Sequence, residues 1–283
     1  MHKLSQSPIF SSDHETVIRP QSHWQSVDIA ELWAYRDLWV AMVMRDIRIR
    51  YKQTVLGVGW AVIQPVVTML IFSLIFGRLA KIPSDGVPYP IFVFSGLLAW
   101  NLFSASISSA GNSMVGAANL VTKVYFPRLL VPLSAMGVAC VDFLIASLVL
   151  LIMMLGFGVT TPWQLLLLPL LLVGLLITSF GIGSWLAAIT VTYRDFRFII
   201  PFMVQIWMYL TPVVYPLSFL PERWQWLMYL NPVNGWIVGI RAVFLGTPIT
   251  WLAIFSSMVW MVVLLFIGLR YFTKTERWFA DVI

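Results

Sequence analysis

Residues 50–79, RYKQTVLGVGWAVIQPVVTMLIFSLIFGRL, constrain the fold of this chain more than any other stretch. After Arg50 and Lys52 the chain runs for more than twenty residues without a charge, and a membrane-spanning helix needs about 20 predominantly apolar residues. The run nevertheless contains Gln64 and Pro65, a polar side chain and a source of kinking that a simple anchor does not need. It therefore predicts a membrane helix with a role beyond anchoring.

The composition extends this prediction to the whole chain. Hydrophobic residues make up 60% of the 283 residues and charged residues 11%, against about half and about a quarter in soluble domains. We expect an all-α polytopic membrane protein, with a polar tail at 1–27, an amphipathic segment at 28–56 and one membrane domain over 57–283. The apolar runs predict six spans, at about 57–78, 91–111, 132–156, 164–190, 198–216 and 250–270.

The cations indicate the orientation of these spans. An even number of crossings places both termini on one side, and cytoplasmic loops carry the excess of Lys and Arg. Of the 18 Lys and Arg residues, 14 fall in the N-terminal segment, the loops at 112–131 and 191–197, and the C-terminal tail. The other four are Arg78, Lys81, Arg223 and Arg241. Both termini are therefore expected in the cytoplasm, and topology explains the net charge of +6 without a nucleic-acid partner.

The segment 28–56 has a different pattern. An apolar helical face is formed by Ile29, Leu32, Trp33, Val40, Val43 and Ile47. Arg45, Arg48 and Lys52 share another face, and Trp39 is suited to the membrane interface. This pattern predicts a helix in the headgroup layer, with its cations toward anionic lipid. The alternative is a helix that packs on a partner.

An apolar but broken stretch precedes the last span. Its halves, roughly 221–230 and 232–245, are both too short to cross a membrane. Asn231 is suited to cap the second half, with Pro232 at its first helical position. We expect a re-entrant helical hairpin that dips into the membrane from outside and is packed in protein or beside a cavity.

The residue inventory argues against catalysis. The three histidines all precede residue 24, and Cys140 is the single cysteine. Asp142 is the one acid inside a predicted span; it is either functional or a hydrogen-bonded packing residue. No glycine is followed by lysine, so the P-loop pattern is missing. We expect no catalytic residues, metal or cofactor in this chain, and ATP-driven movement would need a separate nucleotide-binding subunit.

Two loops on the expected cytoplasmic side could receive such a subunit. In NLVTKVYFPRLLVP (119–132), cations flank apolar side chains, as in a knob that docks in a partner's groove. The residues are Lys123, Val124, Tyr125, Phe126 and Arg128. The second loop contributes Arg194 and Asp195. The alternatives are insertion of the first loop into headgroups and simple Arg–Asp pairing in the second.

The motifs of this chain closely resemble those of the permease subunits of ABC-2-type polysaccharide exporters, a family that includes O-antigen, capsule and teichoic acid transporters. The resemblance runs from about residue 30 to the C-terminus. It is carried in order by RYKQTVLGVGWAVIQPVVTMLIFSLIFGRLA, YPIFVFSGLLAWNLFSASISSAGNSMV, NLVTKVYFPR, VDFLIASLVLL, YRDFRFIIPF, TPVVYP and LNPVNGWIVGIRAVFLG.

This resemblance implies a homodimer in the bacterial cytoplasmic membrane, bound to two copies of a separate ATPase that holds ATP and Mg²⁺. It implies that NLVTKVYFPR is the coupling helix, that the N-terminal amphipathic helix is the interface helix and that the hairpin forms periplasmic gate helices. The implied cargo is a lipid-linked polysaccharide, most simply O-antigen. The rivals are capsule or teichoic acid export, drug export and a membrane glycan-processing enzyme.

Aromatic side chains suit a glycan conduit, because their flat apolar faces match sugar C–H groups at low entropic cost. Many weak contacts also permit both entry and exit. Candidates on the first and fifth spans are Phe72, Phe76, Phe198, Phe202, Tyr209 and Tyr215. The alternative is that these residues only pack.

Overall fold

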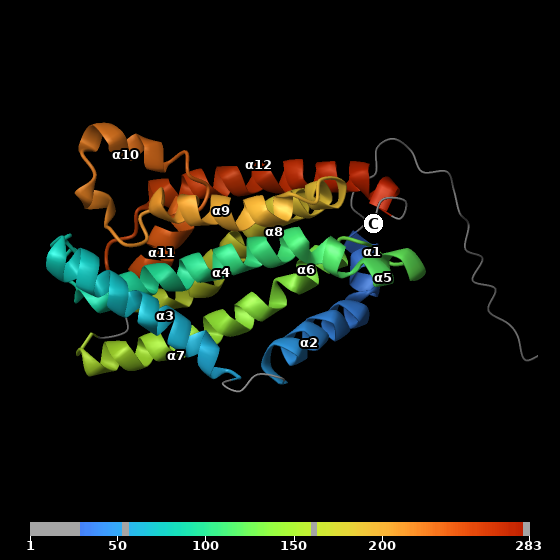
Figure 1. Ribbon diagram of the computed structural model, residues 1–283. Helices are drawn as coiled ribbons and strands as arrows, with labels where there is room; N and C mark the ends of the chain where they lie inside the picture. The colour runs from blue at the N-terminus through green and yellow to red at the C-terminus, as the bar shows by residue number, and fades with distance from the viewer. Residues whose placement is uncertain (1–28, 53–56, 160–162, 280–283) are drawn as a thin grey trace, which may run out of the picture.

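The computed structural model describes residues 29–52, 57–159 and 163–279 of the chain, and every regular element in these ranges is helical. The long helices run roughly side by side along one axis (Figure 1). The polar tail at 1–27 lies outside the described residues.

Five helical segments are long and apolar enough to cross a membrane. They overlap the expected spans one, two, three, four and six, and the protein is a multi-pass membrane protein. Their components are α3 (Gly59–Phe72) with the π-helical η1 (Ser73–Leu79), α4 (Tyr89–Gly116), α6 (Leu130–Ala135) with α7 (Gly137–Gly156), η2 (Trp163–Leu167) with α8 (Leu168–Thr192), and α12 (Trp251–Thr275) with η4 (Glu276–Trp278).

The expected fifth span at 198–216 is a shorter helix, α9 (Phe196–Tyr209), which has 14 residues. At about 1.5 Å per residue it measures about 21 Å, less than the hydrocarbon thickness of about 30 Å. It packs against α4 and α8. By length alone, α9 does not establish a sixth crossing.

The side chains of Arg241 and of Tyr89 in α4 bind the backbone directly after α9, an arrangement that we call the clamp. The guanidinium of Arg241, from α11 (Asn234–Leu245), donates hydrogen bonds to the carbonyl oxygens of Pro212 (2.8 Å) and Val213 (2.5 Å). The next carbonyl, of Val214, accepts one from the Tyr89 hydroxyl at 2.7 Å. Three consecutive carbonyls of a non-helical segment are thus satisfied by side chains, the condition for irregular backbone inside a membrane.

Arg241 itself is held in a fitted site. Its side chain is 5% exposed, and the guanidinium carbon lies 4.0 Å from the centroid of the Phe92 ring. Gly96 of α4 leaves room for it, because a Cβ there would collide with the guanidinium and with the Val213 carbonyl. Arg241, which the distribution of cations predicts in an outer loop, is therefore a buried structural residue.

The broken stretch after α9 forms two short helices, α10 (Glu222–Met228) and α11, separated by residues 229–233. The expected cap at Asn231 is wrong, because α11 begins three residues later. Instead, Asn231 Oδ1 accepts hydrogen bonds from the Trp207 indole (3.0 Å) and the Val233 amide (3.2 Å). Asn231 thereby joins α9 to the start of α11, and α11 packs against α4, α8 and α12.

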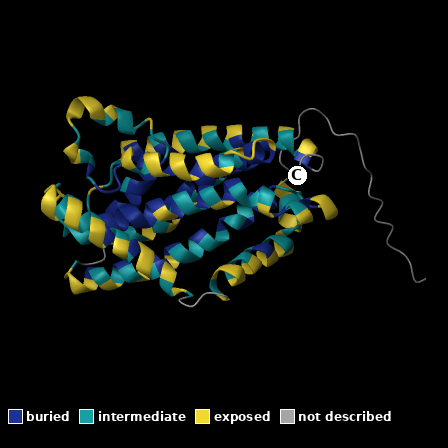
Figure 2. Cartoon of the chain, viewed as in Figure 1, coloured by how far each residue is buried: buried dark blue, intermediate teal, exposed yellow. Residues whose placement is uncertain are grey.

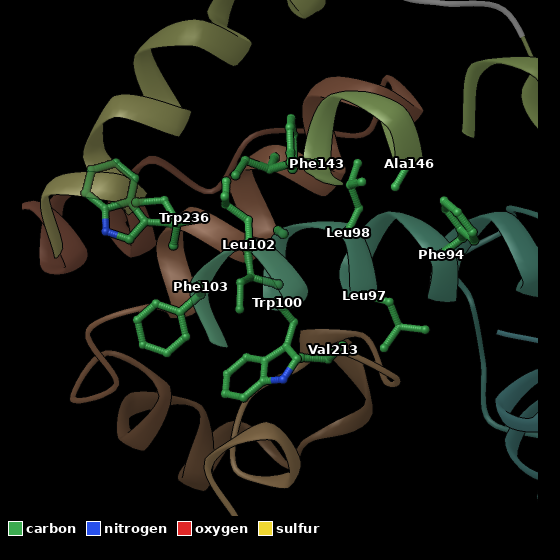
Figure 3. Packing of buried hydrophobic residues seen from close by; sticks show 14 of the residues in the cluster. Phe94, Leu97, Leu98, Trp100, Leu102, Phe103, Phe143, Ala146, Val213 and Trp236 are labelled. Atoms are coloured by element: carbon green, nitrogen blue, oxygen red, sulfur yellow. The ribbon is translucent and has the colours of Figure 1, made fainter. Parts of the chain in front are cut away.

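Helix α4 lies at the centre of the main hydrophobic core, which it forms with α7, α8 and α11. Figure 3 shows Trp100 and Phe103 of α4 on one side of this helix and Phe143 of α7 on another. The outward faces of α3, α7 and α12 carry exposed aliphatic and aromatic residues (Figure 2). Such faces are suited to contact lipid tails.

Glycines bring three helices into backbone contact. A Cβ at Gly268 of α12 would lie less than 3.0 Å from the backbone carbonyl of Gly181 in α8. A Cβ at Gly235 of α11 would meet the carbonyl of Ala253 in α12 equally closely. Close approach of this kind is typical of membrane helix interfaces.

A second hydrophobic cluster gathers the elements at one end of the bundle. It includes Met42 of α2 (Arg36–Lys52), Phe126 of the loop before α6, Val191 at the end of α8, Phe272 of α12 and Phe279 directly after η4. The segments expected in the cytoplasm therefore meet at one end of the molecule.

Candidate functional site

The loop after α5 (Ala118–Lys123) presents only some of its expected docking residues. Lys123 and Val124 are exposed, and Tyr125 is 79% exposed. Phe126 is 3% exposed and lies in the second cluster, so its predicted exposure is wrong. The backbone at Val124 is extended, and side chains of an extended segment point alternately to opposite sides. Phe126 therefore anchors the loop that displays Tyr125.

Arg128 forms hydrogen bonds with Glu276 of the same chain. Its backbone amide donates to Glu276 Oε1 at 3.4 Å, and its guanidinium donates to the Glu276 carbonyl oxygen. The residue thus ties the loop to η4 at the end of α12. A change at Arg128 would disturb this connection as well as any contact with a partner. The sequence pattern did not indicate the connection to Glu276.

Tyr125 lies close to α1 (Ile29–Ala34). The carboxylate of Glu31 and partial burial raise the pKa of the Tyr125 phenol. Because the ordinary value of 10.0 is already well above neutral, the ring is uncharged at physiological pH. The loop therefore offers a neutral aromatic side chain beside the Lys123 cation.

The α8–α9 connection adds two exposed charges, Arg194 and Asp195. In the described part of the chain no ion pair joins them, so the simple pairing alternative finds no support. They follow within four residues of Val191, which belongs to the second cluster. We call Lys123, Val124, Tyr125, Arg194 and Asp195 the coupling surface.

Three aromatic side chains of α9 face away from the bundle. Phe198, Phe202 and Tyr209 are 74%, 63% and 54% exposed, and their spacing places them on one side of the helix. Only Ile200 and Val204 of α9 are buried. We call Phe198, Phe202 and Tyr209 the α9 aromatic face.

The other three conduit candidates are packed. Phe72 and Phe76 are half-buried against the main core, with their rings 5.6 Å apart in an edge-to-face arrangement. Tyr215 is also half-buried, and its hydroxyl donates to the Tyr209 carbonyl oxygen at 3.3 Å. The six candidates therefore divide into an exposed set and a packed set.

Helix α2 packs along α6 and α7. Of its predicted interface residues, Trp39 is half-buried, Arg48 and Lys52 are exposed, and Arg45 Nη2 lies 2.8 Å from Asp46 Oδ1. The buried contact residue of α2 is Met42, which the apolar pattern did not include. The helix thus has a protein-facing side as well as a cationic one.

Asp142 of α7 is bound by α2. Arg50 Nη2 lies 2.7 Å from its Oδ2, and the Tyr51 hydroxyl donates to its Oδ1. Burial and this hydrogen bond raise the pKa of Tyr51 to about 12. These partners are 91 or more residues away in the sequence, so no local pattern could have identified them. Among the described residues, no cluster of His, Cys, Asp and Glu is suited to a metal.

The apolar spans, the buried polar clamp and the exposed features at one end define a polytopic helical membrane protein. The chain belongs to the ABC-2 type transporter family, whose sequence profile matches residues 37–245. This is a family of transport permeases rather than enzymes.

Similar proteins cover most of the chain. It is 30% identical over 219 residues to the O-antigen export system permease protein RfbA of Myxococcus xanthus, covering 76% of this chain and 83% of the relative. It is 26% identical over 251 residues to the protein of the same name from Klebsiella pneumoniae, covering 87% and 95%. It is 27% identical over 252 residues to the polysialic acid transport protein KpsM of Escherichia coli, covering 84% and 93%.

Proposed function

We propose that this chain is the permease subunit of an ATP-driven exporter that moves a lipid-linked polysaccharide of the O-antigen type across the bacterial cytoplasmic membrane. The observation that carries the proposal is the near full-length similarity to permeases named for O-antigen export. Capsule export is the second candidate, because the polysialic acid transport protein is similar over a comparable length.

The α9 aromatic face supports a role as the wall of a conduit. A glycan needs a lining that replaces water without binding tightly, and aromatic faces provide such weak contacts. One copy of the chain leaves Phe198, Phe202 and Tyr209 on an outer surface. In a homodimer, two such surfaces would enclose a path between the subunits.

The coupling surface supports attachment of a separate ATPase that binds ATP and Mg²⁺. Two copies of this ATPase would bind the dimer, and closure around ATP would shift the permease between two states. The excess of Lys and Arg in the termini and in the loops at 112–131 and 191–197 supports a topology in which this end and both termini are cytoplasmic. In this topology α9 and the clamped segment after it complete a sixth crossing, and α10 and α11 form a gate at the periplasmic end.

Deletion of the gene tests the proposed function. The deletion strain should lose its surface polysaccharide and accumulate the lipid-linked polymer in the cytoplasm, because synthesis continues without export. Polysaccharide is measured on intact cells and in extracts, and the wild-type gene should restore the surface signal. An unchanged surface polysaccharide would contradict the proposal, and loss of capsule alone would favour the second candidate.

Tyr125→Asp should separate attachment of the ATPase from folding. Tyr125 is almost fully outside the packed core, so the variant should purify and melt like the wild type. Loss of an aromatic contact residue at an interface weakens binding by about 2 kcal/mol, or about 30-fold in affinity. The measurements are recovery of the permease–ATPase complex and stimulation of ATP hydrolysis.

Two variants control this experiment. Tyr125→Phe keeps the ring and should bind the ATPase normally. Phe126→Ala removes a buried anchor and should lower the melting temperature, which Tyr125→Asp should not. Normal complex recovery with Tyr125→Asp would exclude Tyr125 from the coupling surface.

A further inference from the structure

A cleft of about 290 Å³ lies where α2, α3, α4 and α7 meet. Its polar wall is formed by Arg50, Gln64, Asn101 and Asp142, with the Trp60 indole at the same opening. Ser104 of α4 also lines the cleft, and the remaining lining residues are apolar and come mostly from α4 and α7. Polar side chains over an apolar floor are the usual composition of a small-molecule site. This cleft contains none of the residues of the coupling surface or the α9 aromatic face.

The cleft extends from the start of the first span, at Arg50 and Trp60, to Asn101 and Asp142, which lie deeper along α4 and α7. Trp60 and Gln64 lie in the first two turns of α3, where the first span begins, and Arg50 lies in the last turn of α2. Figure 1 shows this end of α2 beside the start of α3. Lipid headgroups occupy this level, and Trp and Arg are residues typical of it.

The charges of the cleft select among headgroups. Among the described residues, Arg50 and Asp142 are the only charged ones that line the cleft, and the net charge of their ion pair is zero. Their side chains remain 49% and 21% exposed. A guanidinium has five N–H donors and a carboxylate about four acceptor positions, so each group has capacity beyond the ion pair and the Tyr51 hydrogen bond to Asp142. A purely anionic headgroup would be repelled by Asp142, whereas a zwitterion can satisfy both charges.

We propose that this cleft binds the headgroup of a zwitterionic aminophospholipid, with the phosphate on Arg50 and the ammonium on Asp142. The amides of Gln64 and Asn101 then serve the remaining phosphate and ester oxygens. The volume is at the lower end of the range for small-molecule sites, about 300–1,000 Å³. It therefore fits a headgroup and excludes a polysaccharide chain. A bound lipid would join the interface helix α2 to three helices of the bundle.

Lipid selectivity tests the proposal. The purified full-length protein is equilibrated with vesicles of equal phosphatidylethanolamine and phosphatidylglycerol, and retained lipid is quantified by mass spectrometry. Only phosphatidylethanolamine can donate a charge-assisted hydrogen bond to Asp142, so the wild type should favour it about tenfold or more over phosphatidylglycerol. Asp142→Asn removes the ammonium partner and leaves Arg50, so this variant should favour phosphatidylglycerol. Arg48→Gln, an exposed cation of α2 outside the cleft, should behave like the wild type.

Two further variants keep the proposal testable if Asp142→Asn does not fold. Gln64→Leu and Asn101→Leu preserve the ion pair and change exposed positions, so both should fold and retain several-fold less phosphatidylethanolamine than the wild type. The proposal is overturned if the wild type retains both lipids equally or favours phosphatidylglycerol. It is also overturned if folded Asp142→Asn keeps the wild-type preference, or if both leucine variants retain lipid normally.

Discussion

Gly268→Ala is expected to destabilise the protein strongly, because Gly268 is a point of backbone contact between α12 and α8. The new Cβ would lie less than 3.0 Å from the carbonyl oxygen and carbon of Gly181. Both are backbone atoms of α8, so no side chain can rotate away. Helices α8 and α12 would have to separate along their shared interface. Overpacking costs typically 1–3 kcal/mol, and we expect about 3 kcal/mol or more here because the obstacle is backbone.

This loss should appear as a lower melting temperature and poor recovery of monodisperse protein. Association of membrane helices depends on close packing, since lipid tails are as apolar as the helix surfaces. Separation of α8 from α12 would therefore leave little to hold them together.

Gly156→Ala provides the matched control. Gly156 ends α7, and a Cβ there would meet nothing within 4 Å. Alanine is favoured over glycine in helices by up to about 1 kcal/mol, so this variant should melt at or slightly above the wild-type temperature. A wild-type melting temperature for Gly268→Ala would show that α8 and α12 are not in backbone contact.

The sequence predicted the spans best where length and apolar composition alone decide them. It did not predict where α9 ends, because the backbone that follows is bound by Arg241, 28 residues or more away from the carbonyls it binds. A cation in a broken apolar stretch was assigned to an outer loop. Its partners are backbone groups, which leave no side-chain signature in the sequence.

The candidate site was predictable only in part, for a related reason. In soluble helices, apolar positions mark the side that faces the core. A membrane helix is apolar on both its protein side and its lipid side, so this contrast disappears. The spacing therefore identified aromatics on one side of a helix without showing which way that side points. Phe72 and Phe76 pack inward, whereas Phe198 and Phe202 point outward.

The same limit applies to the two loops and to Asp142. Phe126 follows Tyr125 in the sequence, but alternation in an extended segment sends their side chains in opposite directions. Asp142 had two interpretations, and its ion pair with Arg50 depends on how α2 folds back on α7. Long-range chain geometry of this kind is not contained in local patterns.

The double variant Phe202→Ala/Tyr209→Ala is expected to export about tenfold less polysaccharide while keeping the wild-type stability. Each aromatic contact with a passing sugar would contribute about 0.5–1.5 kcal/mol, so loss of two weakens the path by about one order of magnitude or more. Both side chains are more than half exposed, and changes at such positions alter folding stability by about 0.5 kcal/mol or less. Surface polysaccharide is measured in the deletion strain that carries the variant gene, and melting is measured on the purified protein.

Two further changes on α9 distinguish a conduit wall from a packing surface. The Trp207 ring lies 5.2 Å from Phe103 in an edge-to-face contact, and its indole N–H binds Asn231. Trp207→Ala should therefore lose about 3–5 kcal/mol of stability, and export should fall because less protein is folded. Leu210→Ala changes an exposed position off the aromatic face and should alter neither property. If the Phe202 and Tyr209 variants melt as low as Trp207→Ala, or separate into monomers, these aromatics are buried against a second copy of the chain. The α9 aromatic face would then be a subunit contact, and the polysaccharide would have to pass along another surface.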